Sequence, residues 1–390
     1  MSAALEFREV SILFAQHDAG RKNLGSAAQA LSSGASRADV ATRFGVIAGV
    51  VDASLQVQSG QICVLVGLSG SGKSTLLRAA NGLNVVSSGA VLLQDGAVTV
   101  DVASCDQRTL RRLRRRRIAM VFQQFGLLPW RSVRANVGLG LELRGESRAR
   151  QQQIVDEKLE LVGLSQWAER AVGELSGGMQ QRVGLARAFA TDADILLMDE
   201  PFSALDPLIR SRLQDELLSL QARVQKTILF VTHDMNEALR LGNQISILEG
   251  GRMVQTGTAS DIVTRPCNDY VAAFVQHMNP LTVLTAEMVM QPVAELAHES
   301  SYLWLDAQRR LKVQTDAQGR VLQAWCDGVV VDLAQAPTQG TLQSVVELHH
   351  ASTHPVLVTD ATGLVGVCGS AQIVAALSRH NHPTPIAATA

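Results

Sequence analysis

Residues 67–75 read Gly-Leu-Ser-Gly-Ser-Gly-Lys-Ser-Thr and lie between two regular stretches of the chain. The apolar run Ile62–Val66 before them is typical of a buried strand, and Thr75–Asn81 has the pattern of a helix. In that context the glycines let backbone N–H groups converge on phosphate oxygens, and the helix N-terminus adds partial positive charge. A chance match in a chain of this length is on the order of one in a hundred. The stretch therefore predicts a phosphate-binding loop, or P-loop.

Two side chains of this loop have the chemistry that nucleotide hydrolysis needs. Lys73 is placed to reach the β- and γ-phosphates, and the hydroxyl of Ser74 is placed to ligate Mg²⁺. We expect every residue of the loop to contact ATP; the candidates are Gly67, Leu68, Ser69, Gly70, Ser71, Gly72, Lys73, Ser74 and Thr75.

A second stretch, Ile195–Glu200 (ILLMDE), is an apolar run that ends in two carboxylates. Ligands of open α/β sheets bind at the carboxyl ends of the strands. Asp199 can there hold Mg²⁺ through water, and Glu200 can orient or deprotonate the attacking water. By itself the run could equally be a capped strand. Together with the P-loop it indicates a site that hydrolyses MgATP.

Short apolar runs alternate with helical stretches from residue 62 to about residue 250, which predicts an α/β domain with a mainly parallel sheet. Earlier strands are expected over Leu5–Val10, continuing toward Phe14, and over Val50–Val57. Residues 20–45 are rich in Ala, Ser and Gly. They predict a surface insertion with one helix, which begins at the capping-box spacing of Ser36 and Asp39.

The composition excludes several classes of protein. With 46% hydrophobic and 18% charged residues in 390, the chain is not intrinsically disordered. A net charge of −1 and 4% aromatic residues argue against a nucleic-acid platform. Five dispersed cysteines without a CxxC pair fit a reducing compartment, and no apolar run approaches the roughly 20 residues of a membrane span. We expect a cytoplasmic, globular protein.

Leu175–Arg182, LSGGMQQR, predicts a second anion-binding helix N-terminus. Ser176 can cap the helix, and Gly177 and Gly178 leave the backbone N–H groups uncovered. The chain has one P-loop, so the phosphate that this end binds must belong to the nucleotide of another subunit.

The LSGGMQQR stretch, the P-loop, ILLMDE, Ser203–Asp206 (SALD) and Thr232–Asp234 (THD) together resemble the ATP-binding cassette (ABC) ATPases over roughly residues 5–265. The resemblance implies a P-loop NTPase domain with a helical subdomain, and a homodimer that encloses two MgATP. It places Ser176, Gly177, Gly178 and Gln180 at the γ-phosphate of the opposite subunit. Asp206 matches the loop that links the two sites of the dimer.

The same resemblance completes the catalytic and metal sets. His233 matches the switch histidine that contacts the γ-phosphate. Gln123, after the expected strand Ile118–Phe122, matches the glutamine that touches Mg²⁺ and senses the membrane subunit; Gln124 could serve by chemistry, but the family register favours Gln123. The catalytic set is then Glu200, His233 and Gln123, and the metal set is Ser74, Gln123 and Asp199. For the aromatic residue that stacks on adenine, Phe14 is the first candidate and Phe44 the second.

Two features bear on what the ATPase drives. Seven of the ten residues Arg108–Arg117 are arginine, which favours a solvated face over a nucleic-acid contact in a chain of neutral net charge. Phe125–Asn136 combines apolar residues with a proline and a tryptophan, which is typical of a groove for a partner helix.

QQFGLLPW (123–130), LARAFATDADILLMDEPFSALDPLIR (185–210) and the insertion before GVVDASL (49–55) resemble the ATPase subunits of quaternary-amine importers, nearest to the choline type. The resemblance implies import of choline or glycine betaine, with two transmembrane permease subunits and, indirectly, a periplasmic or lipid-anchored substrate-binding protein. It implies no nucleic-acid partner and a peripheral place on the cytoplasmic face of the inner (plasma) membrane. The alternative is a cytosolic ABC-type ATPase that acts on nucleic acid.

The last part of the chain predicts a separate small α+β domain. We expect an ATP-binding domain over 1–280 and a C-terminal domain over 281–390. Residues 341–380 have a helix–strand–turn–strand–helix pattern and resemble one cystathionine-β-synthase (CBS) module, with 281–330 as a degenerate first copy. Such modules regulate transport in relatives through ionic strength or a bound nucleotide; a dimerisation domain is the alternative.

Overall fold

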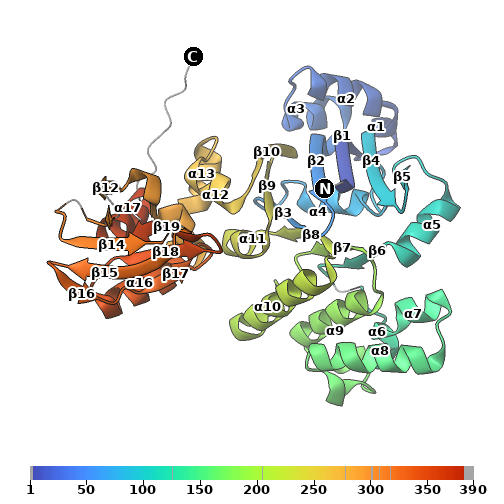
Figure 1. The fold of residues 1–390 in the computed structure, drawn as a ribbon. Helices are drawn as coiled ribbons and strands as arrows, with labels where there is room; N and C mark the ends of the chain where they lie inside the picture. Colours follow the sequence, from blue (N-terminus) through green and yellow to red (C-terminus); the bar gives the residue numbers. More distant parts are fainter. Residues whose placement is uncertain are drawn as a thin grey trace. The chain divides into compact units, whose positions relative to one another are not determined.

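A six-stranded sheet forms the centre of the first part of the computed structural model (Figure 1). Five of its strands run parallel and β10 pairs antiparallel with β9, which confirms the predicted mainly parallel sheet. The strands β3, β7 and β8 are buried along their whole length. In spatial order the strands are β10 (Arg252–Gly257), β9 (Gln244–Glu249), β3 (Ile62–Val66), β8 (Thr227–Thr232), β7 (Ile195–Asp199) and β6 (Ile118–Val121).

The structure describes residues 3–124, 126–203, 205–276, 278–299, 302–306, 308–316 and 318–381. It divides into two units, Met1–Ala259 and Ser260–Ala390, which are described separately. The division falls before the predicted boundary at residue 280. α13 (Asp269–Gln276) contacts α17 (Ser370–Asn381), so the residues just before 280 pack with the C-terminal elements.

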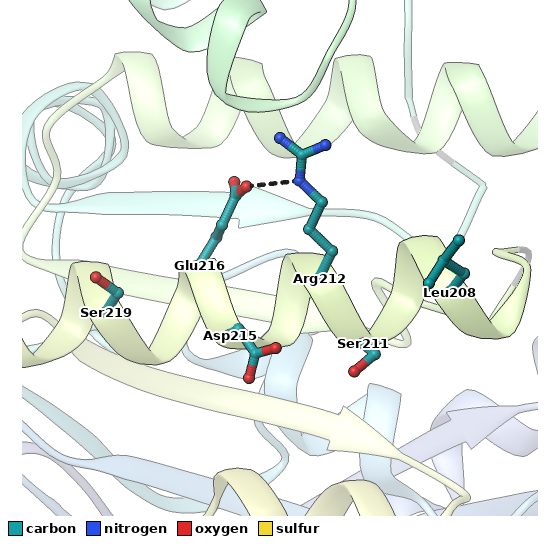
Figure 2. Close-up of a pocket in the computed structure, with 6 residues that line it drawn as sticks. All are labelled: Leu208, Ser211, Arg212, Asp215, Glu216 and Ser219. Atoms are coloured by element: carbon teal, nitrogen blue, oxygen red, sulfur yellow. Dashed lines mark hydrogen bonds and ion pairs between the residues drawn. The ribbon is translucent and has the colours of Figure 1, made fainter.

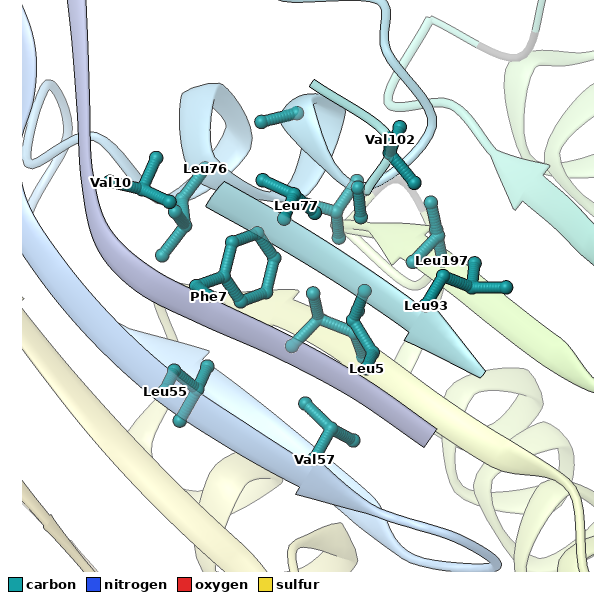
Figure 3. Close-up of a cluster of buried hydrophobic side chains, with 14 of the residues drawn as sticks. Leu5, Phe7, Val10, Leu55, Val57, Leu76, Leu77, Leu93, Val102 and Leu197 are labelled. Atoms are coloured by element: carbon teal, nitrogen blue, oxygen red, sulfur yellow. The ribbon is translucent and has the colours of Figure 1, made fainter. Parts of the chain in front are cut away.

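A second, antiparallel sheet in the first unit has the strand order β2-β1-β4-β5. Apolar side chains from this sheet, from α4 and from β7 meet in one buried cluster (Figure 3). Phe7, Leu76 and Leu197 are among its fully buried members, and together they fix α4 between the sheets. The elements are β1 (Ala3–Ala15), β2 (Val46–Gln58), β4 (Ser88–Asp95), β5 (Val98–Asp101) and α4 (Lys73–Ala79).

The insertion over residues 20–45 differs from the prediction of one helix. The capping box of Ser36 and Asp39 is present and begins α3 (Arg37–Phe44), but two further helices precede it, α1 (Asp18–Lys22) and α2 (Leu24–Ser32). The apolar face of α2 consists mainly of alanine, so its helical period is weak in the sequence. Ala27 and Leu31, one turn apart, nevertheless bury themselves in a small local core.

The resemblance to ABC ATPases implied a helical subdomain, and the structure contains one, in which α6, α8 and α9 pack together (Figure 1). α9 begins directly after Ser176, and α10 begins directly after Asp206. The α-helices between residues 107 and 241 of the first unit are α5 (Gln107–Arg116), α6 (Val133–Val137), α7 (Leu139–Arg144), α8 (Arg148–Leu161), α9 (Gly177–Ala190), α10 (Pro207–Val224) and α11 (Met235–Leu241).

The second unit contains a four-stranded sheet in the order β11-β19-β18-β17. β17 is parallel to β18, and β18 forms a hairpin with β19. Along the chain these elements alternate with helices as β17–α16–β18–β19–α17. Their bounds are α12 (Ala259–Thr264), α14 (Pro280–Val283), α15 (Ala286–Val289), β11 (Gln291–Pro292), β17 (Gln335–Pro337), α16 (Leu342–Ser352), β18 (Val356–Asp360) and β19 (Gly363–Cys368).

The stretch 281–330, predicted to be a degenerate copy of the following module, has a different architecture. After the short helices α14 and α15 it forms most of a five-stranded antiparallel sheet in simple chain order. Strands of three to six residues show too few repeats for a period of two to stand out in the sequence. The strands are β12 (Ala297–Glu299), β13 (Tyr302–Trp304), β14 (Leu311–Thr315), β15 (Val321–Cys326) and β16 (Val329–Val331).

Candidate nucleotide-binding site

The P-loop joins the end of β3 to the start of α4. Two of its glycines are required by close backbone approaches: a Cβ on Gly67 would lie 2.3 Å from the carbonyl oxygen of Leu248, and one on Gly72 would lie 2.4 Å from that of Gly49. Gly72 also has a φ of 100°, which disfavours any side chain. The loop is therefore held tightly against its neighbours, while Leu68, Ser69 and Gly70 at its tip are exposed.

Lys73 is folded back onto the loop that carries it. Its Nζ donates to the carbonyl oxygens of Gly67 (2.8 Å) and Leu68 (2.9 Å), and the residue is only 5% exposed. Burial lowers the pKa of Lys73, and the nearby carboxylates of Glu200 and Asp199 partly oppose that change. The ammonium group thus lies at the centre of the loop, bound to carbonyl oxygens that a phosphate can replace.

Asp199 is completely buried at the end of β7. The hydroxyl of Ser74 donates to its Oδ1 (2.6 Å), and Arg78 donates to its Oδ2 (2.9 Å). The structure therefore brings together Ser74 and Asp199, two members of the predicted metal set. Arg78 is a contact that the sequence reasoning missed. It follows Ser74 by four residues on α4, so helical spacing alone places both on one face.

Glu200 follows Asp199 and adopts a left-handed backbone conformation, with a φ of 48°. Its Oε2 lies 3.4 Å from Nε2 of Gln123 and 3.2 Å from Nδ1 of His233. The three residues follow the neighbouring parallel strands β6, β7 and β8, whose carboxyl ends meet at one edge of the sheet. Gln123, rather than Gln124, makes this contact. Gln123 and His233 thus both contact the same carboxylate oxygen of Glu200, which brings the three predicted catalytic residues together.

The main chain of Glu200 is held by two further side chains. Gln181 Nε2 donates to its carbonyl oxygen (3.3 Å), and Ser203 Oγ donates to the same oxygen (3.1 Å). Gln181 is buried, and the sequence reasoning missed it. The neighbouring Gln180 faces elsewhere and donates to the carbonyl oxygen of Leu175 (3.0 Å).

The LSGGMQQR stretch forms the N-terminus of α9. Ser176 is its N-cap and accepts a hydrogen bond from the backbone N–H of Met179 (3.4 Å). Ser176 and Gly177 are exposed, and a Cβ on Gly177 would meet no atom within 4 Å. The start of α9, with Gly178 in its first turn, is thus open to an approaching anion. Asp206 similarly caps α10 by accepting from the N–H of Ile209 (3.1 Å).

The two adenine candidates lie in different surroundings. Phe14, near the end of β1, is 41% exposed. It lies beside the P-loop helix, because a Cβ built on Gly49 would meet both Phe14 Cε2 (2.8 Å) and Thr75 Cγ2 (3.0 Å). Phe44 instead packs against the local core of the insertion. Phe125 and Ala204, which belong to predicted motifs, lie outside the described residues.

A hollow elsewhere in the first unit contains none of these residues. Figure 2 shows that it is lined by side chains along α10, where Arg212 Nε donates to Glu216 Oε1 (3.1 Å). Its lining residues are Leu208, Ser211, Arg212, Asp215, Glu216 and Ser219. It lacks a glycine-rich loop or a metal-ligand set, so we do not consider it a nucleotide site.

A P-loop beside a pair of carboxylates defines a P-loop protein that hydrolyses nucleotides. Comparisons with known proteins show to which family of such proteins the chain belongs. A family model described as ABC transporter matches residues 50–203. A glycine betaine/carnitine transport ATP-binding protein of Listeria monocytogenes is 46% identical over 69% of this chain and 67% of its own length. A glycine betaine/proline betaine transport system ATP-binding protein of Escherichia coli is 44% identical over 74% and 69%, respectively.

A solved dimer of a bacterial ABC transporter cassette is also similar, with 28% identity and a TM-score of 0.55 over 65% of this chain and 98% of that chain. The chain therefore belongs to the ABC transporter family and is an ATP-binding subunit, an ATPase. This confirms the predicted family and the predicted P-loop NTPase fold. Among the described residues, no helix has the length and apolar character needed to cross a membrane.

Proposed function

We propose that the chain powers an importer of a quaternary ammonium compound, choline or glycine betaine, as one of two identical ATP-hydrolysing subunits. The observation that carries the ATPase part is the convergence of Gln123 and His233 on Oε2 of Glu200, next to the buried Asp199. The two relatives support a quaternary ammonium compound as the transported substrate. They are transport proteins for glycine betaine, carnitine and proline betaine, which all contain a quaternary ammonium group and a carboxylate.

In this proposal the P-loop holds the phosphates of ATP. Backbone N–H groups from the exposed tip and from the first turn of α4 point at the phosphate oxygens. Lys73 exchanges its bonds to the carbonyl oxygens of Gly67 and Leu68 for the β- and γ-phosphates. Phe14 stacks on the adenine, because it is exposed and lies beside Thr75 at the start of the helix.

The donor set at the end of β7 fits Mg²⁺. A hydroxyl (Ser74), a carboxylate (Asp199) and an amide (Gln123) are the hard oxygen ligands that this ion prefers, with water completing its shell. Held by these residues, Mg²⁺ would supply positive charge that stabilises the phosphate oxygens during hydrolysis. Arg78 fixes the orientation of the Asp199 carboxylate through its 2.9 Å contact, so that the other oxygen stays directed at Ser74.

Glu200 then acts on the attacking water. Its carboxylate accepts the water proton, or orients the water, while Gln123 and His233 hold the carboxylate in place. The backbone of Glu200 is fixed by Gln181 and Ser203, so a small movement of α9 would shift the catalytic group. Gln181 therefore links α9, the helix that begins within LSGGMQQR, to the residue whose carboxylate activates the water.

Two copies complete each other's sites in the proposed assembly. We expect the exposed N-terminus of α9 to approach the γ-phosphate bound to the other copy with Ser176, Gly177 and Gly178. Gln180 would join them if its side chain leaves the carbonyl oxygen of Leu175, and Asp206 would lie in the loop between the two sites. The solved structure of a similar cassette is a dimer, which supports an assembly of two copies. Dimer closure and reopening would drive two permease subunits, with a substrate-binding protein acting indirectly, and would place the chain peripherally at the cytoplasmic face of the membrane.

For the second unit, we propose a CBS-like regulatory module over β17–α16–β18–β19–α17. The order of these elements, with one parallel strand pair followed by a hairpin, supports this assignment. The five-stranded sheet then takes the place of a second module. A role in dimerisation alone is the alternative for this unit.

Uptake of labelled choline and labelled glycine betaine tests the proposal. Cells whose only copy of this chain is the wild type should accumulate at least one of the two compounds, and cells with Lys73→Ala should accumulate neither. The same cells should take up an unrelated labelled sugar normally. Equal uptake in the two strains would contradict the importer function. Co-purification with DNA or RNA instead of a polytopic permease would favour a nucleic-acid ATPase.

A further inference from the structure

An aromatic cluster lies on one face of the five-stranded sheet of the second unit. The chain has four tryptophans and two tyrosines, and three of these six residues, Tyr302, Trp304 and Trp325, gather here. We call them the aromatic triad. Tyr302 and Trp325 are in edge contact, with ring centroids 5.6 Å apart and planes at 82°.

A single cation occupies the centre of the triad. Nζ of Lys312 lies 4.2 Å from the centroid of the Tyr302 ring, 5.5 Å from that of Trp304 and 5.7 Å from that of Trp325. The strand register explains the arrangement, because Lys312 is paired with Trp304 on one side and with Trp325 on the other. All three distances are within the range in which an aromatic face attracts a cation.

The opposite face of the sheet accounts for its folding, so the triad is not needed as core. Side chains that alternate with the triad residues, including Leu303, Val313 and Ala324, are buried in the apolar core of this unit. The triad residues and Lys312 are half-exposed. Three large aromatic side chains around a cation on a half-exposed face are typical of recognition surfaces.

The polar group of Trp304 is bonded at the edge of the triad, and the ring faces are in contact with Lys312. The indole Nε1 of Trp304 donates to Oε2 of Glu299 (3.0 Å), and Arg309 also contacts that oxygen (3.4 Å). The indole N–H is therefore satisfied at the edge of the cluster. Lys312 is the cation that lies over the rings, and Arg309 is paired with Glu299.

We propose that the aromatic triad is a binding site for a quaternary ammonium compound, whose ammonium group takes the position of the Lys312 ammonium. A primary ammonium is strongly hydrated and sits on a flexible stem, so Lys312 can move into water at small cost. A quaternary ammonium has no N–H to donate and presents methyl groups, which makes it better suited to ring faces. The displaced Lys312 would pair with a carboxylate on the ligand.

If the proposed cargo is correct, this site would let the second unit sense the cargo inside the cell. That role rests on the proposed function, whereas binding to the triad does not. The two are tested separately, because binding is measured on the purified full-length chain without permease or transport.

Calorimetric titration of the full-length chain with tetramethylammonium is the first test, since this probe carries only the cationic group. We expect saturable binding at one site per chain. 3,3-Dimethyl-1-butanol, the uncharged carbon analogue of choline, should bind at least about tenfold more weakly than choline. Equal binding of the neutral analogue, or binding of adenosine but not of tetramethylammonium, would refute the assignment.

Substitutions in the triad form the second test. Trp304→Leu and Trp325→Leu keep apolar volume but remove a ring face, and each should weaken tetramethylammonium binding by about tenfold or more. Trp167→Leu, in the first unit, is the matched control and should bind as the wild type does. Each variant must keep the wild-type thermal unfolding curve, and ATP hydrolysis in the first unit should be unchanged. Unaltered binding in both folded triad variants would exclude the triad.

Lys312→Met separates a ligand site from a purely structural contact. The variant removes the competing ammonium, so tetramethylammonium should bind several-fold more tightly than to the wild type. Glycine betaine should gain less, because its carboxylate loses the partner that Lys312 provides. If the triad serves only to hold Lys312, neither the wild type nor this variant will bind tetramethylammonium, and the proposal fails.

Discussion

His233 Nδ1 lies 3.2 Å from Oε2 of Glu200, and this contact joins the ends of two neighbouring buried strands, β8 and β7. Gln123, from the end of β6, approaches the same oxygen at 3.4 Å. The parallel sheet therefore sets the position of the carboxylate from both sides. A group held in this way needs little reorganisation when a water molecule is presented to it.

Glu200→Gln should trap an ATP-bound dimer. The amide keeps the shape of the side chain but cannot accept the water proton, so turnover should fall by about a hundredfold or more. ATP binding should be retained, and size-exclusion chromatography with ATP should show a stable dimer. Glu216→Gln on α10 is the matched control and should hydrolyse ATP normally. Hydrolysis at the wild-type rate by Glu200→Gln would show that another group handles the water.

His233→Ala should lower the rate of hydrolysis without weakening ATP binding. The histidine contacts the catalytic carboxylate, so its loss should reduce kcat by about 10- to 100-fold. The dissociation constant for ATP should stay within about twofold, as measured by equilibrium binding. His298→Ala, in the second unit, provides the control. A large loss of ATP affinity in His233→Ala would instead assign the histidine to binding.

Lys73→Ala should abolish ATP binding and leave the fold intact. The ammonium donates to oxygens of its own loop, namely those of Gly67, Leu68 and Ser71. Its removal therefore deletes the main positive charge for the phosphates and relieves the cost of its burial. Lys158→Ala, in the helical subdomain, should bind ATP normally. The assignment of the P-loop would be wrong if Lys73→Ala bound ATP with unchanged affinity.

Phe14→Ala and Phe44→Ala should differ in their effects on ATP. Stacking of a base on an aromatic ring contributes roughly 1–3 kcal/mol, so Phe14→Ala should raise the dissociation constant for ATP by about tenfold. Phe44→Ala should change the stability of the insertion and leave ATP affinity nearly unaltered, because Phe44 packs against the local core. Titration with a fluorescent ATP analogue measures both variants. The reverse pattern would make Phe44 the adenine contact.

Much of the site could be predicted from the sequence because its parts are local. The P-loop and the strand that ends in Asp199 are each one uninterrupted stretch, and a buried parallel strand has an unmistakably apolar pattern. Gln123 and Gln124 are neighbours with the same chemistry. Only the structure shows that the side chain of Gln123 is the one that meets Glu200.

The features that were missed depend on contacts between distant segments or on short elements. The contact of Gln181 could not be predicted from LSGGMQQR alone. Its side chain donates to the carbonyl oxygen of Glu200, which lies in a later segment of the chain. Arg78 was accessible, because its spacing from Ser74 places both on one helix face. The aromatic triad arises from the register of three short strands, and Trp325 lies 21 residues after Trp304 along the chain.

The sharing of each ATP between two chains is the central claim, and mixing two inactive variants tests it most directly. Lys73→Ala removes ATP binding, and Ser176→Arg blocks the N-terminus of α9. In a mixed dimer with shared sites, one site carries both defects and the other carries neither. Hydrolysis and ATP-driven dimerisation are measured for each variant alone and for the mixture.

We predict that the mixture recovers ATP-driven dimerisation and part of the hydrolysis, whereas each variant alone shows neither. The recovered rate should depend on the square of the protein concentration at low concentration. A mixture no more active and no more dimeric than the two separate variants, together with an ATP-bound wild-type monomer of full activity, would contradict the shared site.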